Sequence, residues 1–108
     1  MSLERVIKAL VGLGLTRLEA EVYVYTAKKG PQTVMDLFKA LNYSKHQIST
    51  GLKTLATKEL ITKDGSMFSA ITFEEALELL INREKKQAKS IEESKKELIV
   101  NWNNNSRS

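Results

Sequence analysis

The polar side chains between residues 44 and 53 are the groups in this chain best placed to do chemistry. At helical spacing Ile48, Leu52 and Leu55 fall on one face, so the residues between them point the other way. That outward face carries ammonium, imidazole and hydroxyl groups from Lys45, His46, Ser49, Thr50 and Lys53. Such groups contact base edges and phosphates. We expect this face, with Ser44 and Gln47 in its first turn, to contact nucleic acid.

Two successive helices are predicted to position that face. Ser44 and Gln47 form a capping box that opens the second helix, and Thr33 caps the first helix over residues 34–41. The buried stripe of the first helix is predicted to consist of Val34, Leu37, Phe38 and Leu41.

The connection between these helices is very short. Only Asn42 and Tyr43 lie between the first helix and the cap of the second, so the helices must cross sharply, as in a helix-turn-helix. Gly51, in the middle of the second helix, is interpreted as the point where the two helices make close contact.

A β-hairpin is predicted after the second helix. Residues 60–63 and 66–71 are rich in β-branched and aromatic side chains, and Asp64-Gly65 between them is a strong turn signal. The order of parts is that of a winged helix-turn-helix, with the hairpin as the wing. The wing tip and the start of the first helix add Lys63, Ser66 and Thr33 to the expected contacts with duplex DNA.

The chain after residue 72 is predicted to form one long helix from Phe73 to about Trp102, roughly 45 Å at 1.5 Å per residue. Alternating steps of four and three residues along it define a seam: Leu77, Ile81, Glu84, Ala88, Ile91, Lys95, Leu98 and Trp102. The six apolar members, Leu77, Ile81, Ala88, Ile91, Leu98 and Trp102, form the expected dimer interface. The alternative is that the helix folds back onto the N-terminal helix of its own chain. The polar end after Trp102 is expected to fray.

Capping signals place two further helices before this module. Leu3, Val6, Ile7, Leu10 and Val11 make one apolar stripe, and Thr16 opens a helix over residues 17–29 that Gly30-Pro31 ends. The fold class is therefore mainly α with a small β-hairpin wing, a winged helix-turn-helix plus a long C-terminal helix. Residues 1–72 form the expected DNA-binding domain and residues 73–108 the dimerisation helix.

Charge is divided unevenly along the chain. Residues 1–72 contain ten Lys and Arg against six Asp and Glu, whereas residues 73–108 contain seven of each. The whole excess of positive charge therefore lies in the predicted DNA-binding half. The chain contains no cysteine, no apolar run long enough for a membrane span and no signal-peptide pattern, so a cytoplasmic location is expected.

Catalysis and metal binding are not predicted. His46 is the only histidine, and without cysteine it has few partners for a metal site. The hydroxyl of Ser44 is assigned to a cap, and Glu74, Glu75 and Glu78 suit the positive end of a helix dipole. We expect no enzyme activity, cofactor or metal ion, and no small-molecule effector is evident from the sequence.

Short motifs in a fixed order also suggest a family. They are Leu13-Gly14-Leu15-Thr16, Glu19-Ala20-Glu21-Val22-Tyr23, Gly30-Pro31, Leu37, Leu41, Ser44, Ile48, Leu52, Leu55, Leu60-Ile61, Phe68-Ser69-Ala70-Ile71 and Glu74-Glu75-Ala76-Leu77. This set resembles the N-terminal domain of archaeal TrmB-type sugar-responsive transcriptional regulators. The resemblance implies DNA binding, transcriptional regulation and pairing through the helix after the wing. The sugar-binding domain that members usually carry is not among these 108 residues, so no sugar sensing is implied.

The expected function is that of a sequence-specific regulator of transcription that binds double-stranded DNA as a homodimer on a palindromic site. A winged-helix module for protein–protein interaction in a larger assembly is the alternative. Binding of single-stranded nucleic acid is a weaker option, because it requires exposed aromatic rings and most of those here are expected to be buried.

Overall fold

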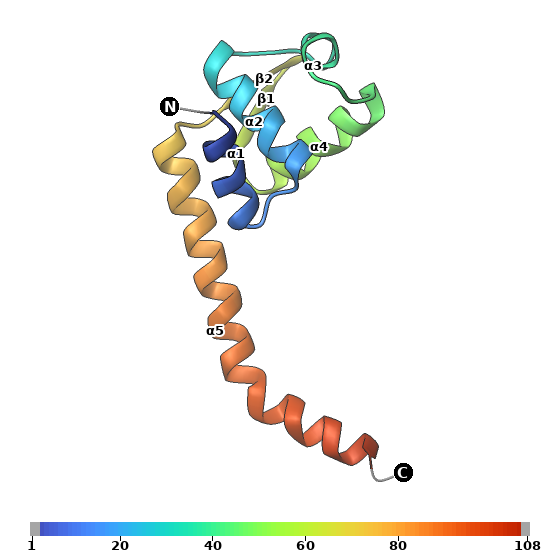
Figure 1. The fold of residues 1–108 in the computed structure, drawn as a ribbon, viewed down its shortest axis with the longest axis vertical. Helices are drawn as coiled ribbons and strands as arrows, with labels where there is room; N and C mark the ends of the chain where they lie inside the picture. The colour runs from blue at the N-terminus through green and yellow to red at the C-terminus, as the bar shows by residue number, and fades with distance from the viewer. Residues whose placement is uncertain (1–2, 107–108) are drawn as a thin grey trace.

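The computed structural model describes residues 3–106, which form five helices and one two-stranded antiparallel sheet (Figure 1). In chain order the elements are α1 (Leu3–Gly12), α2 (Arg17–Lys29), α3 (Val34–Ala40), α4 (Lys45–Thr57), β1 (Ile61–Asp64), β2 (Met67–Ala70) and α5 (Phe73–Ser106). The predicted fold class, a winged helix-turn-helix with a long C-terminal helix, is confirmed.

Reciprocal caps explain where three of the helices begin. Thr16, Thr33 and Ser44 each accept a hydrogen bond from the backbone amide three residues later, and the side chain of that later residue accepts one from the cap's own amide. Two amides that have no partner inside the helix are thereby satisfied at each start. The starts of α2, α3 and α4 follow from local sequence alone.

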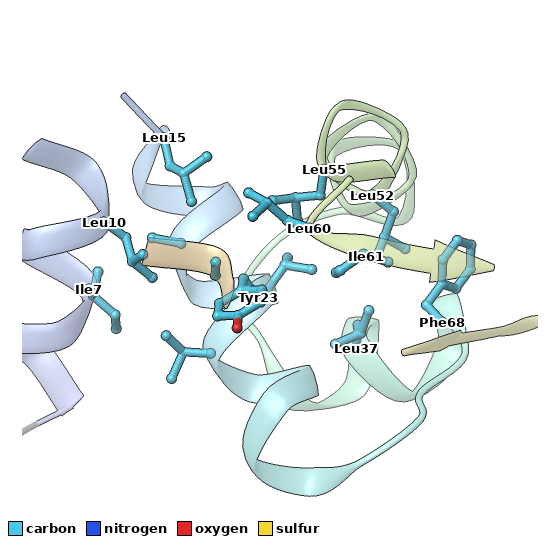
Figure 2. Close-up of a cluster of buried hydrophobic side chains, with 14 of the residues drawn as sticks. Ile7, Leu10, Leu15, Tyr23, Leu37, Leu52, Leu55, Leu60, Ile61 and Phe68 are labelled. Carbon is cyan, nitrogen blue, oxygen red and sulfur yellow. The ribbon is translucent and has the colours of Figure 1, made fainter. Parts of the chain in front are cut away.

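The core is one cluster of apolar side chains from all parts of the module (Figure 2). Its fully buried members include Leu10 of α1, Tyr23 of α2, Leu37 of α3 and Leu52 of α4. The Tyr23 hydroxyl donates a 2.6 Å hydrogen bond to the Ile71 carbonyl, and burial raises the pKa of this tyrosine to about 12. The phenol therefore stays protonated, and it joins α2 to the segment that leads into α5.

The helix α5 belongs to the core only through its first turns. Ala76 and Leu80 are buried in the cluster, whereas beyond Leu80 every described side chain is exposed or, at Ser94, half-buried. The helix projects away from the body (Figure 1), and the radius of gyration is 17.8 Å, against about 13 Å for a compact domain of this length. The alternative, in which the helix folds back onto the N-terminal helix of its own chain, is not observed among the described residues. The helix also continues to Ser106, so the expected fraying after Trp102 is not observed.

The wing differs from its prediction by one residue. Asp64 pairs with Met67, so the two-residue turn is Gly65-Ser66 and not Asp64-Gly65. Gly65 has a φ of +63°, as the first central residue of a type II′ turn requires. The sequence also gave no sign that Gln32 forms a two-way backbone bridge to Phe68, with N–O distances of 2.9 and 2.8 Å. That bridge attaches the start of α3 to the wing.

Two expectations about α3 and α4 are also wrong. Phe38 is 39% exposed and does not belong to the buried stripe of α3. Gly51 does lie at a close contact, but with α2: a Cβ atom there would lie 2.4 Å from Cδ2 of Leu18. The helix α3 is also one residue shorter than predicted, since Leu41 is its C-terminal cap.

The end of α4 has a Schellman arrangement with an unusual residue in it. The Leu60 amide donates to the Leu55 carbonyl and the Glu59 amide donates to the Ala56 carbonyl, both at 3.0 Å. Glu59 occupies the left-handed position with a φ of +66°. Glycine is usual there, because a Cβ atom destabilises that conformation.

Replacing Glu59 by glycine should therefore stabilise the domain, by about 0.5–1 kcal/mol, since relief of the left-handed strain exceeds the added freedom of the unfolded chain. Urea unfolding at constant m-value measures this change. Glu59→Ala is the control, because alanine removes the carboxylate but keeps the Cβ atom. An equal gain in both variants would show that charge, and not backbone strain, is responsible.

Candidate nucleic-acid interface

The outward face of α4 is exposed as the sequence predicts. Lys45, His46, Ser49, Thr50 and Lys53 are all exposed, whereas Ile48, Leu52 and Leu55 on the opposite face are at most 1% exposed. The amphipathic pattern of this helix therefore turns five polar side chains toward solvent, and the buried face fixes their direction.

The helix α2 holds the segment of α4 at three points: just before the helix, in its middle and at its end. Before α4 begins, the Tyr43 hydroxyl donates a hydrogen bond to the Glu21 carboxylate, which raises the pKa of Tyr43. In the middle, the Leu18 side chain packs against Gly51. At the end, the Lys58 ammonium lies 3.6 Å from the largely buried carboxylate of Glu19. The position of the outward face is thus set by α2 as much as by α3.

The first turn of α4 is partly occupied by its own cap. The Ser44 hydroxyl accepts from the Gln47 amide at 3.1 Å, and Oε1 of Gln47 accepts from the Ser44 amide at 2.9 Å. Both side chains are exposed, but the cap uses the oxygen of Gln47. A bidentate contact to adenine needs that oxygen together with the amide nitrogen, so the cap leaves Gln47 with its N–H donors.

Two lysines, one at the start of α4 and one in the wing, are held over aromatic rings. The Lys45 ammonium lies 5.2 Å from the centre of the Phe38 ring, and the Lys63 ammonium lies 5.7 Å from that of Phe68. Such contacts contribute about 0.5–1 kcal/mol at exposed sites and restrict where the charge lies. The role of Phe38 was missed from the sequence, because its helical position at the edge of the apolar stripe is equally suited to the core.

The wing and the start of α3 form one hollow. It is lined by Thr33, Val34, Met35, Lys63, Gly65, Ser66 and Phe68, so the three expected contact residues outside α4 do come together. However, the Asp36 carboxylate accepts a hydrogen bond from the Thr33 amide, which lowers the pKa of Asp36. The start of α3 therefore carries its own anion. The Asp36 carboxylate occupies the Thr33 amide, and the ammonium of Lys63 remains the main group in this hollow that attracts an anion.

Exposed lysines of the DNA-binding half lie in two separate places. Within residues 3–106, Lys45, Lys53 and Lys63 form no ion pair with an acidic side chain, so their charge is available. Lys28, in contrast, lines a hollow with Leu3, Val6 and Phe73, between α1, α2 and the start of α5. It is set apart from the other three lysines.

The apolar members of the seam on α5 are largely uncovered. Ile91, Leu98 and Trp102 are 65%, 57% and 72% exposed, and Ile81 is 40% exposed. Ala88 is also exposed, whereas Leu77 is half-buried against the core. Ile91, Leu98, Ile99 and Trp102 border one shallow hollow on this helix. Large apolar side chains gathered in this way on a single helix are typical of an interface.

Neither a metal site nor a membrane-spanning helix is found in the part of the chain that the structure describes. No three His, Asp or Glu side chains there gather closely enough to hold a metal ion. None of the described helices has the length and apolar character needed to span a membrane.

Comparisons with known proteins agree with this architecture. The family model for the sugar-specific transcriptional regulator TrmB matches residues 10–74. A solved structure of TrmBL2, described as an archaeal chromatin protein with a novel mode of DNA binding, superposes with a TM-score of 0.79 at 22% sequence identity. The alignment covers 91% of this chain but 39% of TrmBL2, so the chain spans well under half the length of that protein. No curated protein sequence matches the chain. The family match extends over more than half of the sequence, and the chain therefore belongs to the TrmB family of transcriptional regulators.

Proposed function

We propose that this chain binds double-stranded DNA sequence-specifically and regulates transcription as a homodimer on a palindromic site. The observation that carries the proposal is the outward face of α4, which exposes five polar side chains next to a wing whose Lys63 has no acidic partner among the described residues. Membership of the TrmB family supports the regulatory role. The description of TrmBL2 as a DNA-binding protein supports the partner.

In the proposed complex α4 enters the major groove. Ser49 and Thr50 contact base edges, and His46 and Gln47 donate to bases or phosphates near the start of the helix. Lys45 and Lys53 contact phosphates on either side of the groove. The wing then reaches the flanking backbone with Lys63 and Ser66, while Thr33 lies behind them at the edge of the interface.

The proposed dimer forms through α5. Pairing of the seams would cover the exposed side chains of Ile91, Leu98 and Trp102, and it would also present two copies of α4 to one duplex. Two linked half-site contacts commonly raise affinity by about 10² or more over a single one.

A protein-interaction module is the second candidate, and one observation favours it. Met35 and Phe38 on α3 are 42% and 39% exposed close to the proposed DNA face. Apolar side chains of this size are also common anchors at protein interfaces. The DNA-binding measurements below distinguish the two candidates.

Salt dependence is the first prediction. If a dimer neutralises about six to eight phosphates, a plot of log K against log salt should have a slope near −5 to −7. Fluorescence anisotropy with a labelled duplex between 50 and about 200 mM salt measures the slope. Undetectable binding at low salt would reject DNA as the partner and leave the protein-interaction candidate.

Substitutions on α4 should separate charge contacts from base contacts. Lys53→Ala should weaken binding to every duplex and flatten the salt slope by roughly one per lost phosphate. Thr50→Ala should instead change the preference among sites, by about 1–3 kcal/mol for a lost base contact. Lys28→Ala is the matched control, since Lys28 lies in the hollow between α1, α2 and α5. If Lys28→Ala has the same effect as Lys53→Ala, the DNA-binding face lies elsewhere.

Charge in the seam should break the dimer. Ile91→Glu places a carboxylate in the proposed interface and should yield a monomer at tens of micromolar, with a loss in affinity for a two-half-site duplex of about 10² or more. Val100→Glu is the matched control, because Val100 is 53% exposed and lies outside the seam. Light scattering measures the mass. A dimer that survives Ile91→Glu unchanged would exclude the seam as the interface.

A further inference from the structure

The two charged residues of the seam occupy related positions. Glu84 and Lys95 interrupt an otherwise apolar series, and both are exposed. The midpoint between them lies between Lys89 and Ser90. The same point is the midpoint of Ala88 and Ile91, of Ile81 and Leu98, and of Leu77 and Trp102. The seam therefore has the same pattern of apolar and charged positions in either direction, except that reversal exchanges the acid and the base.

From this pattern we infer that the second copy packs antiparallel along α5, centred between Lys89 and Ser90. In that register Glu84 of each copy faces Lys95 of the other, and every apolar seam residue faces an apolar one. The inference rests on the proposed homodimer and adds its direction and register. The small side chain of Ala88 lies opposite the large one of Ile91, which allows the helices to approach closely at the centre.

A parallel pairing of the same seam is unfavourable. Residues of equal number then face each other, so Glu84 meets Glu84 and Lys95 meets Lys95 inside the interface. Like charges in contact destabilise a pairing, and in a partly desolvated seam no solvent screens them fully. The antiparallel register replaces two repulsions by two attractions, and apolar seam residues still face apolar ones.

Charges at the edge of the seam favour the same direction. Lys85 and Glu92 each follow an apolar seam residue, Ile81 or Ala88, by four positions, so they lie on the same edge. A twofold axis perpendicular to the helices brings this edge against the same edge of the second copy. Lys85 then lies close to Glu92 of the second copy, which adds two opposite-charge contacts at the rim.

The length of the paired seam determines where the tip of the second helix lies. The pairing from Leu77 to Trp102 spans about 38 Å at 1.5 Å per residue, so Trp102 of the second copy reaches the base of α5. There Leu77 is half-buried beside the core, and the Glu84 carboxylate lies near Gly14, 3.2 Å from where a Cβ atom would be. The two bodies consequently lie at opposite ends of a shared helical rod.

Cysteine cross-linking tests the direction, and the absence of native cysteine makes it specific. Ile81→Cys and Leu98→Cys replace exposed seam residues, so neither should affect the fold. In the antiparallel register neither single variant forms a disulfide dimer on mild oxidation, whereas an equal mixture of the two does. In a parallel dimer each variant alone is cross-linked, and that result would overturn the inference. The experiment is done without DNA and read on a non-reducing gel.

Charge exchange provides a second test of the register. Glu84→Lys should raise the dissociation constant of the dimer about tenfold or more, since two attractions per dimer become repulsions. Adding Lys95→Glu to the same chain should restore the constant to near its original value. In a parallel dimer Glu84→Lys would change little, because equal charges still face each other, and that outcome would reject the inference.

The outcomes separate this inference from the proposed function. Self-cross-linking of the single variants contradicts only the antiparallel direction, whatever the DNA binding. A full-length protein that is monomeric at tens of micromolar and gives no cross-link rejects the dimer itself. Loss of DNA binding with intact antiparallel cross-linking rejects the proposed function alone.

Discussion

The contact between Leu18 and Gly51 is the constraint on which the arrangement of this domain depends. A Cβ atom on α4 at this point would lie 2.4 Å from Cδ2 of Leu18, so with any larger residue the Leu18 side chain would have to move for α2 to stay this close to α4. Glycine in a helix interior costs about 1 kcal/mol relative to alanine. That cost is offset here by the burial of Ile48, Leu52 and Leu55 and by the attachments of Tyr43 and Lys58 to α2. The direction of the outward face of α4 follows from this packing.

The C-terminal helix α5 differs from α4, because most of its length has no core to pack against. Its first turns contribute Ala76 and Leu80 to the body, and the remainder exposes Ile91, Leu98 and Trp102. In proteins most of the stability of a helix comes from packing of its apolar face, which the distal part of α5 lacks within its own chain. Stability of the distal half and self-association are therefore expected to depend on each other.

The predictions that rest on neighbouring residues were the reliable ones. The caps at Thr16, Thr33 and Ser44 and the apolar period of α4 are properties of neighbouring residues, and they located the helices and the outward face. The errors concern residues whose environment is set by distant segments. Gly51 contacts α2 rather than α3, and Phe38 lies over Lys45 rather than in the core. The one-residue shift of the turn, from Asp64-Gly65 to Gly65-Ser66, depends on strand register, which the bridge from Gln32 to Phe68 helps to fix. The direct contacts to DNA remain predictions.

Glu59, the left-handed residue at the end of α4, connects the helix to the wing so that the two elements keep a fixed orientation relative to each other. Leu60 is fully buried and its amide is bound to the last turn of α4, and β1 begins at the next residue. The backbone amides of all three residues between the two elements, Lys58, Glu59 and Leu60, donate hydrogen bonds to carbonyls of α4 and so hold β1 at a set angle. A ligand that spans both must conform to a preset geometry, so its own shape and stiffness become part of the binding energy.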